Sequence, residues 1–123
     1  MARANGAPRV DGGAVERALA EALAPFERPS PENPYKVQQD LQESMQALVG
    51  IVRTESEMQE ALGRLAALRE RAGRAGVEGH REYHTGWHTC LDLRNLLDVS
   101  EAITRAALER RESRGGHFRE DHP

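Results

Sequence analysis

The stretch from Thr85 to Arg111, which reads TGWHTCLDLRNLLDVSEAITRAALERR, decides the fold of this chain. Its apolar residues return every three or four positions, which is the period of one face of an α-helix. The members of this stripe are Cys90, Leu91, Leu93, Leu96, Leu97, Ile103, Ala106 and Ala107. The pattern therefore predicts a helix roughly 40 Å long that packs one side against partner helices.

Two shorter stripes with the same period precede this helix. The first follows Asn33 and Pro34, a capping residue and a proline suited to the first helical position. The second follows Thr54 and Glu57, which have the spacing of a capping box. The stripes consist of Val37, Leu41, Met45, Leu48, Val49 and Val52, and of Met58, Ala61, Leu62, Leu65, Leu68 and Ala72. We therefore expect two more helices, the second of which fades at residues 73–76.

The N-terminal part of the chain predicts a leader and one short helix. Residues 1–10 are small and polar and include glycine and proline, which is typical of a flexible leader. Asp11 is placed to cap a short helix, and we expect the apolar side of this helix to cover a seam of the bundle. Pro25 is expected to end or bend it. Residues 28–34 contain three prolines and predict an extended connector.

The composition indicates a single all-α domain. Only 4% of the 123 residues are aromatic and β-branched residues are sparse, so material for a β-sheet is scarce. A chain of this length suits one domain. The predicted fold is an antiparallel three-helix bundle over residues 11–123, with an additional short N-terminal helix and a polar C-terminal tail. Gly115 is expected to supply the left-handed residue that stops the last helix.

Charge and hydropathy exclude several classes of partner. The 17 basic and 20 acidic residues are interspersed and give a net charge of −3, so no surface for nucleic acid is expected. No run approaches the about 18 apolar residues that cross a bilayer, so direct membrane insertion is not expected. The N-terminus has no apolar segment of a secretory signal. Cys90 is the only cysteine, which favours a reducing, cytoplasmic location.

A group of histidines and aromatics precedes and begins the long helix. His80, His84 and His88 recur every four residues, and on one continuous helix they would share a face and could bind zinc. Gly86 interrupts such a helix, so we favour loop and helix-start histidines, and whether they bind metal stays open. The aromatic side chains of this segment, Tyr83 and Trp87, are expected to anchor the start of the helix rather than to stack on a ligand.

The last eleven residues form a dense polar tail around a pair of glycines. They read SRGGHFREDHP over residues 113–123. Arginine offers a planar fork that suits carboxylates and carbonyls, and glycine lets a backbone lie close to a partner surface. We therefore expect the tail to dock the bundle onto another protein surface. The candidate docking residues are Ser113, Arg114, Gly115, Gly116, His117, Arg119 and Asp121.

Four segments together resemble one family. Residues 113–121 are similar to its "SRGGHxRxD" ending, and residues 37–46 to its "lQxxM" helix. Residues 49–54 resemble its "VGIVRT" turn, and residues 87–97 its "GWHxxLDLRNML" segment. The matches come in family order and cover roughly residues 33–123. The family is the flavoprotein subunit of succinate dehydrogenase and fumarate reductase, and the resemblance is to its C-terminal helical domain.

The resemblance implies a role in an oxidoreductase that interconverts succinate and fumarate with FAD. The catalytic and flavin-binding parts of such subunits lie in other domains, and no G-x-G-x-x-G fingerprint occurs in this chain. We therefore expect the chain to hold no catalytic, cofactor-binding or metal residues and to supply docking and packing surface. The implied partners are the flavin-binding domain of the same subunit and an iron–sulfur subunit. The complex would lie at the inner face of the membrane.

Two alternatives remain beside this interpretation. One is a free-standing helical interaction module that binds a separate flavin domain. The other is the helical end of an L-aspartate oxidase, although the ending at residues 116–121 fits the dehydrogenase better. Neither the direction of the reaction nor the quinone follows from the sequence.

Overall fold

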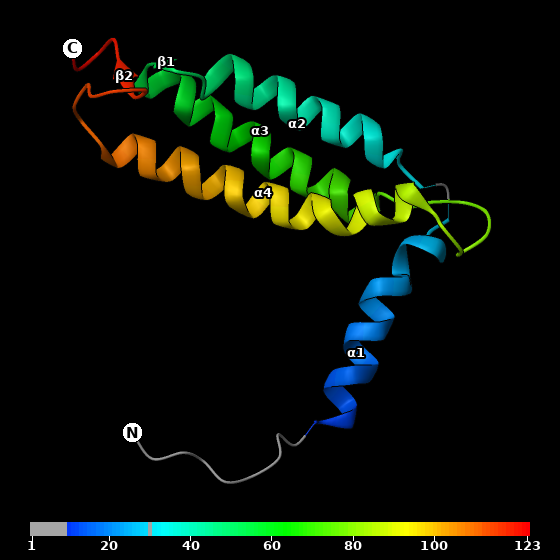
Figure 1. The fold of residues 1–123 in the computed structure, drawn as a ribbon. Helices are drawn as coiled ribbons and strands as arrows, with labels where there is room; N and C mark the ends of the chain where they lie inside the picture. Colours follow the sequence, from blue (N-terminus) through cyan, green and yellow to red (C-terminus); the bar gives the residue numbers. More distant parts are fainter. Residues whose placement is uncertain (1–9, 30) are drawn as a thin grey trace, which may run out of the picture.

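The computed structural model describes residues 10–29 and 31–123 and confirms an all-α bundle. Helices α2 (Pro34–Leu48), α3 (Glu55–Arg74) and α4 (Thr85–Glu109) lie side by side. Helix α3 runs antiparallel to the other two, as the predicted bundle requires (Figure 1). The last helix begins at the predicted residue and ends two residues before Arg111.

The helix starts follow the predicted capping residues. Oδ1 of Asn33 accepts from the amide of Tyr35 at 2.9 Å, at the start of α2. At the start of α3 the amide of Glu57 donates to Oγ1 of Thr54 at 3.3 Å. The amide of Thr54 donates to Oε2 of Glu57 at 3.0 Å, which completes the capping box. These local hydrogen bonds satisfy amides that have no partner inside the helix.

The core lies between the three long helices. Its main cluster consists of Val37, Leu41, Leu65, Leu68, Ala75, Leu93 and Leu97. A second cluster, Leu48, Val49 and Ala61, lies near the other end of α2. Each fully buried leucine or valine stabilises the fold by about 1.5–3 kcal/mol relative to exposure. Thr104 is also fully buried, and its hydroxyl donates to the carbonyl of Ser100 at 2.8 Å.

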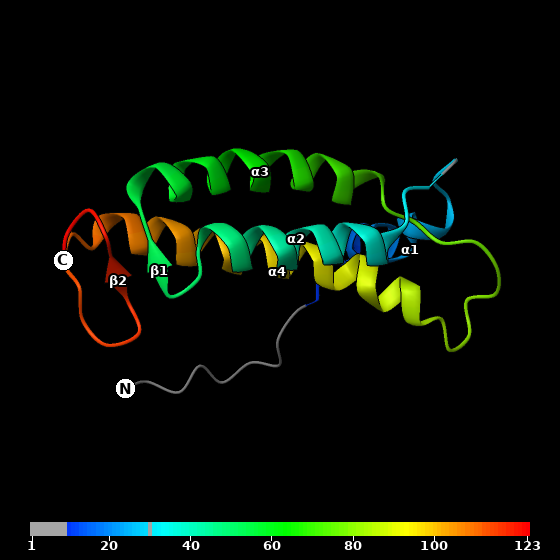
Figure 2. The same ribbon diagram turned by 90° about the horizontal axis from the view of Figure 1, so that it is seen from above.

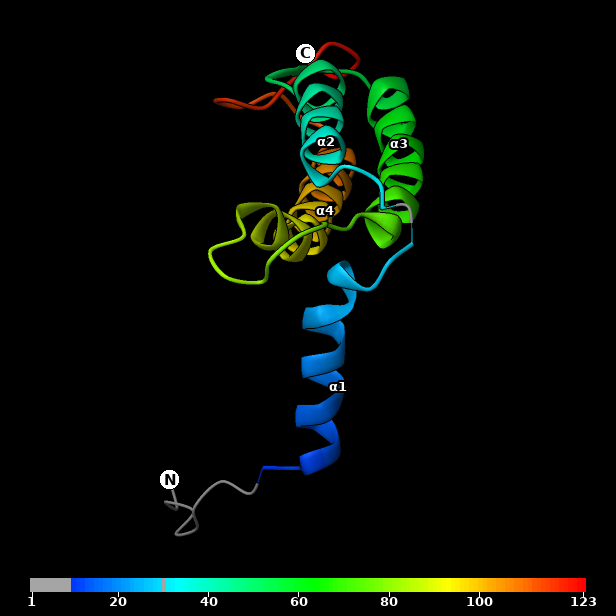
Figure 3. The ribbon, with the colours of Figure 1, turned by 90° about the vertical axis from the view of Figure 1, so that its right-hand side faces the viewer.

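The first helix, α1 (Gly12–Leu23), does not cover a seam of the bundle, so that prediction was wrong. Figures 1 and 3 show it pointing away from the end of the bundle. It contains no buried residue, although Asp11 caps it as predicted by accepting from the amide of Gly13 at 3.1 Å. Pro25 lies in the short 3-10 helix Ala24–Phe26, where the chain turns before the connector. Residues 1–9 of the leader predicted over residues 1–10 lie outside the described residues.

A joint built from three segments holds the base of α1 against the bundle. The amide of Val77 donates to the carbonyl of Pro25 at 2.9 Å, and the amide of Gly76 donates to that of Glu32 at 3.2 Å. A Cβ on Gly76 would lie 2.6 Å from the Pro25 carbonyl oxygen, so only glycine fits here. The indole of Trp87 donates to the carbonyl of Ala22 at 2.6 Å. The direction of α1 is therefore set by backbone contacts at its C-terminal end.

The two aromatic residues around the start of α4 have different roles. Trp87 packs against Phe26 and anchors the joint, as predicted for a helix-start aromatic. Tyr83 is 99% exposed and has a φ of 53°, so the prediction that it anchors the helix was wrong. It occupies a left-handed turn position in the connection to α4, where its ring contributes nothing to the core.

Two short strands close the opposite end of the bundle. Strands β1 (Val52–Arg53) and β2 (Phe118–Arg119) pair in parallel, with Val52 opposite Phe118. The amide of Phe118 donates to the carbonyl of Ile51 at 3.1 Å, and β2 lies beside β1 in Figure 2. The prediction that Val52 belongs to the second helix was wrong, because α2 ends at Leu48 and Val52 lies in β1. The sequence did not show this pair of strands, because two residues are too few to show a strand period. In the described part of the chain, no helix is long and apolar enough to cross a membrane.

Candidate docking site

The C-terminal tail folds back as a tight turn on the end of the bundle. The amide of Arg114 donates to the carbonyl of His117 at 2.8 Å, and the reverse bond measures 3.2 Å. Gly115 adopts a φ of 63° at the tip of this turn. The prediction that Gly115 stops α4 was wrong, because the helix ends at Glu109, before the turn begins. Glycine is needed here for the turn itself.

The side chain of Arg119 caps the C-terminal end of α4. Its side chain is fully buried, and Nη1 donates to the carbonyls of Ala107 and Arg110 at 3.3 Å each and of Leu108 at 3.4 Å. These are among the last carbonyls of the helix, which have no amide partner within it. A buried guanidinium thus satisfies the helix end and places a positive charge where the helix dipole favours one.

Asp121 completes this contact from the other side of the guanidinium. Its two oxygens accept from Nε and Nη2 of Arg119, both at 2.7 Å, in a two-pronged ion pair. One of them also accepts from the amide of Glu55 at 2.9 Å, at the start of α3. The hydrogen bonds from Arg119 hold the pKa of the Asp121 carboxyl well below its ordinary value, and those to Asp121 raise the pKa of Arg119. The pair therefore ties the tail to α3 and α4 together.

His117 and Ser113 also face the chain itself. Nη1 of Arg53 donates to Nδ1 of His117 at 2.8 Å, so Nε2 carries the proton of the neutral ring and donates to the carbonyl of Arg110 at 3.2 Å. Oγ of Ser113 accepts from the amide of Arg119 at 2.9 Å and donates to the carbonyl of His122 at 2.8 Å. Burial lowers the pKa of Arg53.

The predicted docking residues thus divide into an inner and an outer set. The inner set, Ser113, His117, Arg119 and Asp121, is engaged within the chain. The outer set, Arg114, Gly115 and Gly116, is exposed, and the Arg114 side chain is 77% accessible. A Cβ added at either glycine would meet no atom within 4 Å. The turn is open to a partner, while the inner residues fix its backbone.

Within the described residues, His80, His84 and His88 around the start of α4 do not come close enough together to share a metal ion. Nδ1 of His84 accepts from the amide of Trp87 at 3.3 Å and caps α4, and its Nε2 donates to the carbonyl of Glu78 at 3.1 Å. Among residues 10–29 and 31–123, Glu55, Asp121 and His122 are the one set of side chains close enough to share a metal ion. Asp121 in this set is already paired with Arg119.

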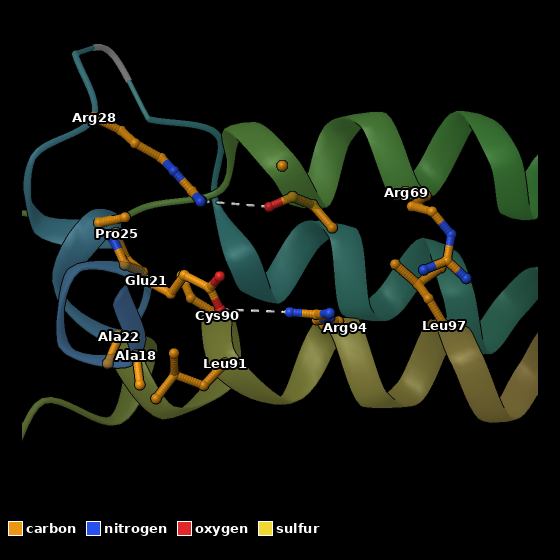
Figure 4. A pocket seen from close by; sticks show the side chains of 13 residues that line it. Ala18, Glu21, Ala22, Pro25, Arg28, Arg69, Cys90, Leu91, Arg94 and Leu97 are labelled. Carbon is orange, nitrogen blue, oxygen red and sulfur yellow. Dashed lines mark hydrogen bonds and ion pairs between the residues drawn. The ribbon is translucent and has the colours of Figure 1, made fainter. Parts of the chain in front are cut away.

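A cavity of about 550 Å³ opens in the angle between α1 and the bundle. We call it the elbow cavity; its lining includes Ala18, Ala22, Cys90, Leu91, Arg94 and Leu97. In Figure 4, Glu21 of α1 faces Arg94 of α4, and their charged atoms lie 3.7 Å apart. Burial raises the pKa of the Cys90 thiol, which is half-buried in the cavity wall. The sequence did not predict this cavity, because its existence depends on the direction of α1.

Comparisons with known proteins place these features in one family. The family described as fumarate reductase flavoprotein C-term matches residues 38–123. The succinate dehydrogenase flavoprotein subunit of Coxiella burnetii is 36% identical over 110 residues, which are 88% of this chain and 19% of that protein. The L-aspartate oxidase of Acinetobacter baylyi is 40% identical over 84 residues, which are 68% of this chain and 14% of that protein.

A solved structure matches the whole arrangement. The Mycobacterium smegmatis Sdh1 structure in complex with UQ1 is 52% identical, with a TM-score of 0.92. The match covers 97% of this chain and 20% of that one, so this chain spans about a fifth of the length of its relatives or less. The chain belongs to the family of fumarate reductase flavoprotein C-terminal domains, which succinate dehydrogenase flavoprotein subunits share.

Proposed function

We propose that this chain is the helical domain that completes an FAD-dependent flavoprotein subunit, which interconverts succinate and fumarate. The observation that carries the proposal is the family match over residues 38–123, together with relatives about five times as long. In the complete subunit the flavin takes up the two electrons released when succinate becomes fumarate, or returns them in the opposite direction. This chain supplies surface for assembly and no catalytic residue.

The flavin has its place in the rest of the subunit. Phosphates of a dinucleotide are usually held by a glycine-rich turn between a strand and a helix. Within residues 10–29 and 31–123, the strands are two residues long, and the loop from β1 to α3 contains Thr54 and no glycine. The described residues therefore do not fit a dinucleotide, and we derive no step through FAD from them.

The outer set of the tail is the proposed contact with the flavin-binding domain. Arg114 is exposed and carries a fork that suits carboxylates and carbonyls, and it forms an exposed ion pair with Glu112 at 3.5 Å. The inner set holds the turn in place before a partner arrives, so little ordering entropy remains to be lost on docking. An iron–sulfur subunit and a position at the inner membrane face belong to the same proposal, since Mycobacterium smegmatis Sdh1, a similar solved structure, is a complex that was also solved with UQ1.

The test is association with the remainder of the matched chain from the Mycobacterium smegmatis Sdh1 complex, which on this proposal bears the flavin and is called the flavin-bearing remainder below. We expect the full chain to bind it, and Arg114→Ala to weaken binding about tenfold or more, as for an interface arginine. Arg111→Ala, which removes an exposed arginine outside the turn, is the matched control. Failure of the unaltered chain to bind would refute the proposed function. If Arg114→Ala and Arg111→Ala weaken binding equally, the tail is not part of the interface.

An L-aspartate oxidase remains the second candidate, because the Acinetobacter baylyi enzyme is 40% identical over its matched segment. The same binding assay separates the two. The flavin-bearing remainder of that oxidase serves as the competing probe. Tighter binding to the Sdh1 remainder supports the dehydrogenase, and tighter binding to the oxidase remainder supports the alternative.

A further inference from the structure

Helix α1 exposes an apolar face to solvent. Val15 is 51% and Leu19 58% exposed, and no residue of the helix is buried. Ala18 and Ala22 continue this face toward the bundle, at the three- and four-residue spacing of one helix side. An amphipathic helix of twelve residues is only marginally stable in water without a surface to cover its apolar side.

The helix is nevertheless held in one direction. Its C-terminal end is fixed by the Trp87 indole on the Ala22 carbonyl, and the joint continues through the bond between Val77 and Pro25. Gly76 packs too closely against this segment for any side chain. The apolar face is therefore presented at a set angle to the bundle.

The elbow cavity is continuous with this face. Ala18 and Ala22 lie beside Leu91 in Figure 4, which gives the cavity an apolar floor. At its rim Arg94 is 76% exposed, and its pairing with Glu21 is loose at 3.7 Å. Such a surface suits a segment with an apolar side chain beside an acidic one, because Arg94 can exchange Glu21 for a better-placed carboxylate.

A chain that is about five times as long matches this fold with a TM-score of 0.92. The match with Mycobacterium smegmatis Sdh1 extends over nearly the whole of this chain, so it includes α1 as well as the bundle. The matched part is 20% of that chain, so the other four-fifths of it has no counterpart here. Large exposed apolar faces are rare on soluble proteins and usually mark contact surfaces. We therefore expect the rest of such a chain to cover the apolar face of α1.

We propose that α1 and the elbow cavity form a second docking surface that receives the flavin-binding part of the subunit. This rests on the proposed function and adds to it a surface at the opposite end of the bundle from the tail. An apolar side chain of the partner enters the cavity beside Cys90, while Val15 and Leu19 cover the partner's neighbouring surface. The bundle is thereby held at both ends.

The test uses the full chain and the flavin-bearing remainder of Sdh1. Leu19→Arg should weaken binding about tenfold, as for a central apolar contact, and leave the unfolding midpoint of the isolated chain unchanged. Ile103→Arg is the matched control, because Ile103 is also an exposed apolar helix residue, on α4, and does not line the cavity. Ala18→Trp should act like Leu19→Arg by filling the cavity.

Cys90 provides an independent readout of cavity occupancy. It is the only cysteine of the chain and lines the cavity, so docking should slow its alkylation by iodoacetamide. Mass spectrometry of the peptide that contains Cys90 measures the rate of alkylation. If the unaltered chain binds but Leu19→Arg binds equally and Cys90 stays reactive, this surface is refuted while the proposed function stands. If the unaltered chain does not bind, the proposed function itself fails.

Discussion

Arg119 combines a charged head group with complete burial at the end of α4. It stays charged there because Asp121 and helix-end carbonyls surround the guanidinium with acceptors. The residue types of the tail could be predicted to make polar contacts, but not whether the contacts are within the chain or with a partner. Whether the contacts form within the chain depends on how close the fold brings the tail to α4. The spacing of residues within the tail does not show this distance.

Replacement of Arg119 should destabilise the bundle strongly. Arg119→Ala leaves buried carbonyls without a donor, so the free energy of unfolding should fall by about 2–4 kcal/mol. Arg119→Lys keeps the charge but loses the planar fork, so its free energy of unfolding should lie between those of Arg119→Ala and the unaltered chain. Urea unfolding followed by circular dichroism measures both. Arg114→Ala, at an exposed site, should change the value by less than about 0.5 kcal/mol; equal effects at the two arginines would contradict the assigned roles.

Asp121 should make the tail sensitive to acid. Its folded pKa lies below its ordinary value, so its contribution to stability is present above about pH 4 and is lost as pH falls through the lowered pKa. Asp121→Asn should therefore be less stable than the unaltered chain at neutral pH, and this difference should shrink toward about pH 2. Unfolding measured across this range tests the prediction, with Asp92→Asn as the control. A difference that does not depend on pH would refute it.

At the level of elements, the three long helices and the N-terminal caps of α2 and α3 were predictable because each depends on residues within four positions. The His84 cap of α4 was not predicted. The direction of α1 was not, since it follows from contacts between residues 25 and 77 and between residues 22 and 87. The pairing of β1 with β2 joins segments more than sixty residues apart and is equally invisible in a local pattern. The elbow cavity and the fold-back of the tail are consequences of these distant contacts.

Gly76 tests the joint that directs α1. Gly76→Ala would place a Cβ 2.6 Å from a backbone oxygen, so the free energy of unfolding should fall by about 1–3 kcal/mol. The fluorescence of Trp87, the only tryptophan, should also change because it packs in this joint. Gly63→Ala is the control: it lies in α3 with open space around its Cβ and should stabilise by about 0.5–1 kcal/mol. A neutral Gly76→Ala would show that the joint is loose.

At the scale of the whole molecule, the chain is a helical bundle whose two ends are closed in different ways. The tail closes one end through the Arg119–Asp121 pair, and α1 leaves the other end at a fixed joint. Family membership could be predicted from motifs spread along residues 33–123, and the comparisons confirm it. The second docking surface that we propose could be inferred only from the structure, because α1 lies before the matched motifs and its period alone predicted burial within this chain.

Succinate oxidation measured with an artificial electron acceptor tests the central claim most directly. The purified chain alone should carry no flavin absorbance and should not reduce the acceptor. When it is added to the flavin-bearing remainder of Mycobacterium smegmatis Sdh1, succinate-dependent reduction should rise with the amount of complex formed. Turnover of succinate by the isolated chain, or stoichiometric FAD bound to it, would contradict the account.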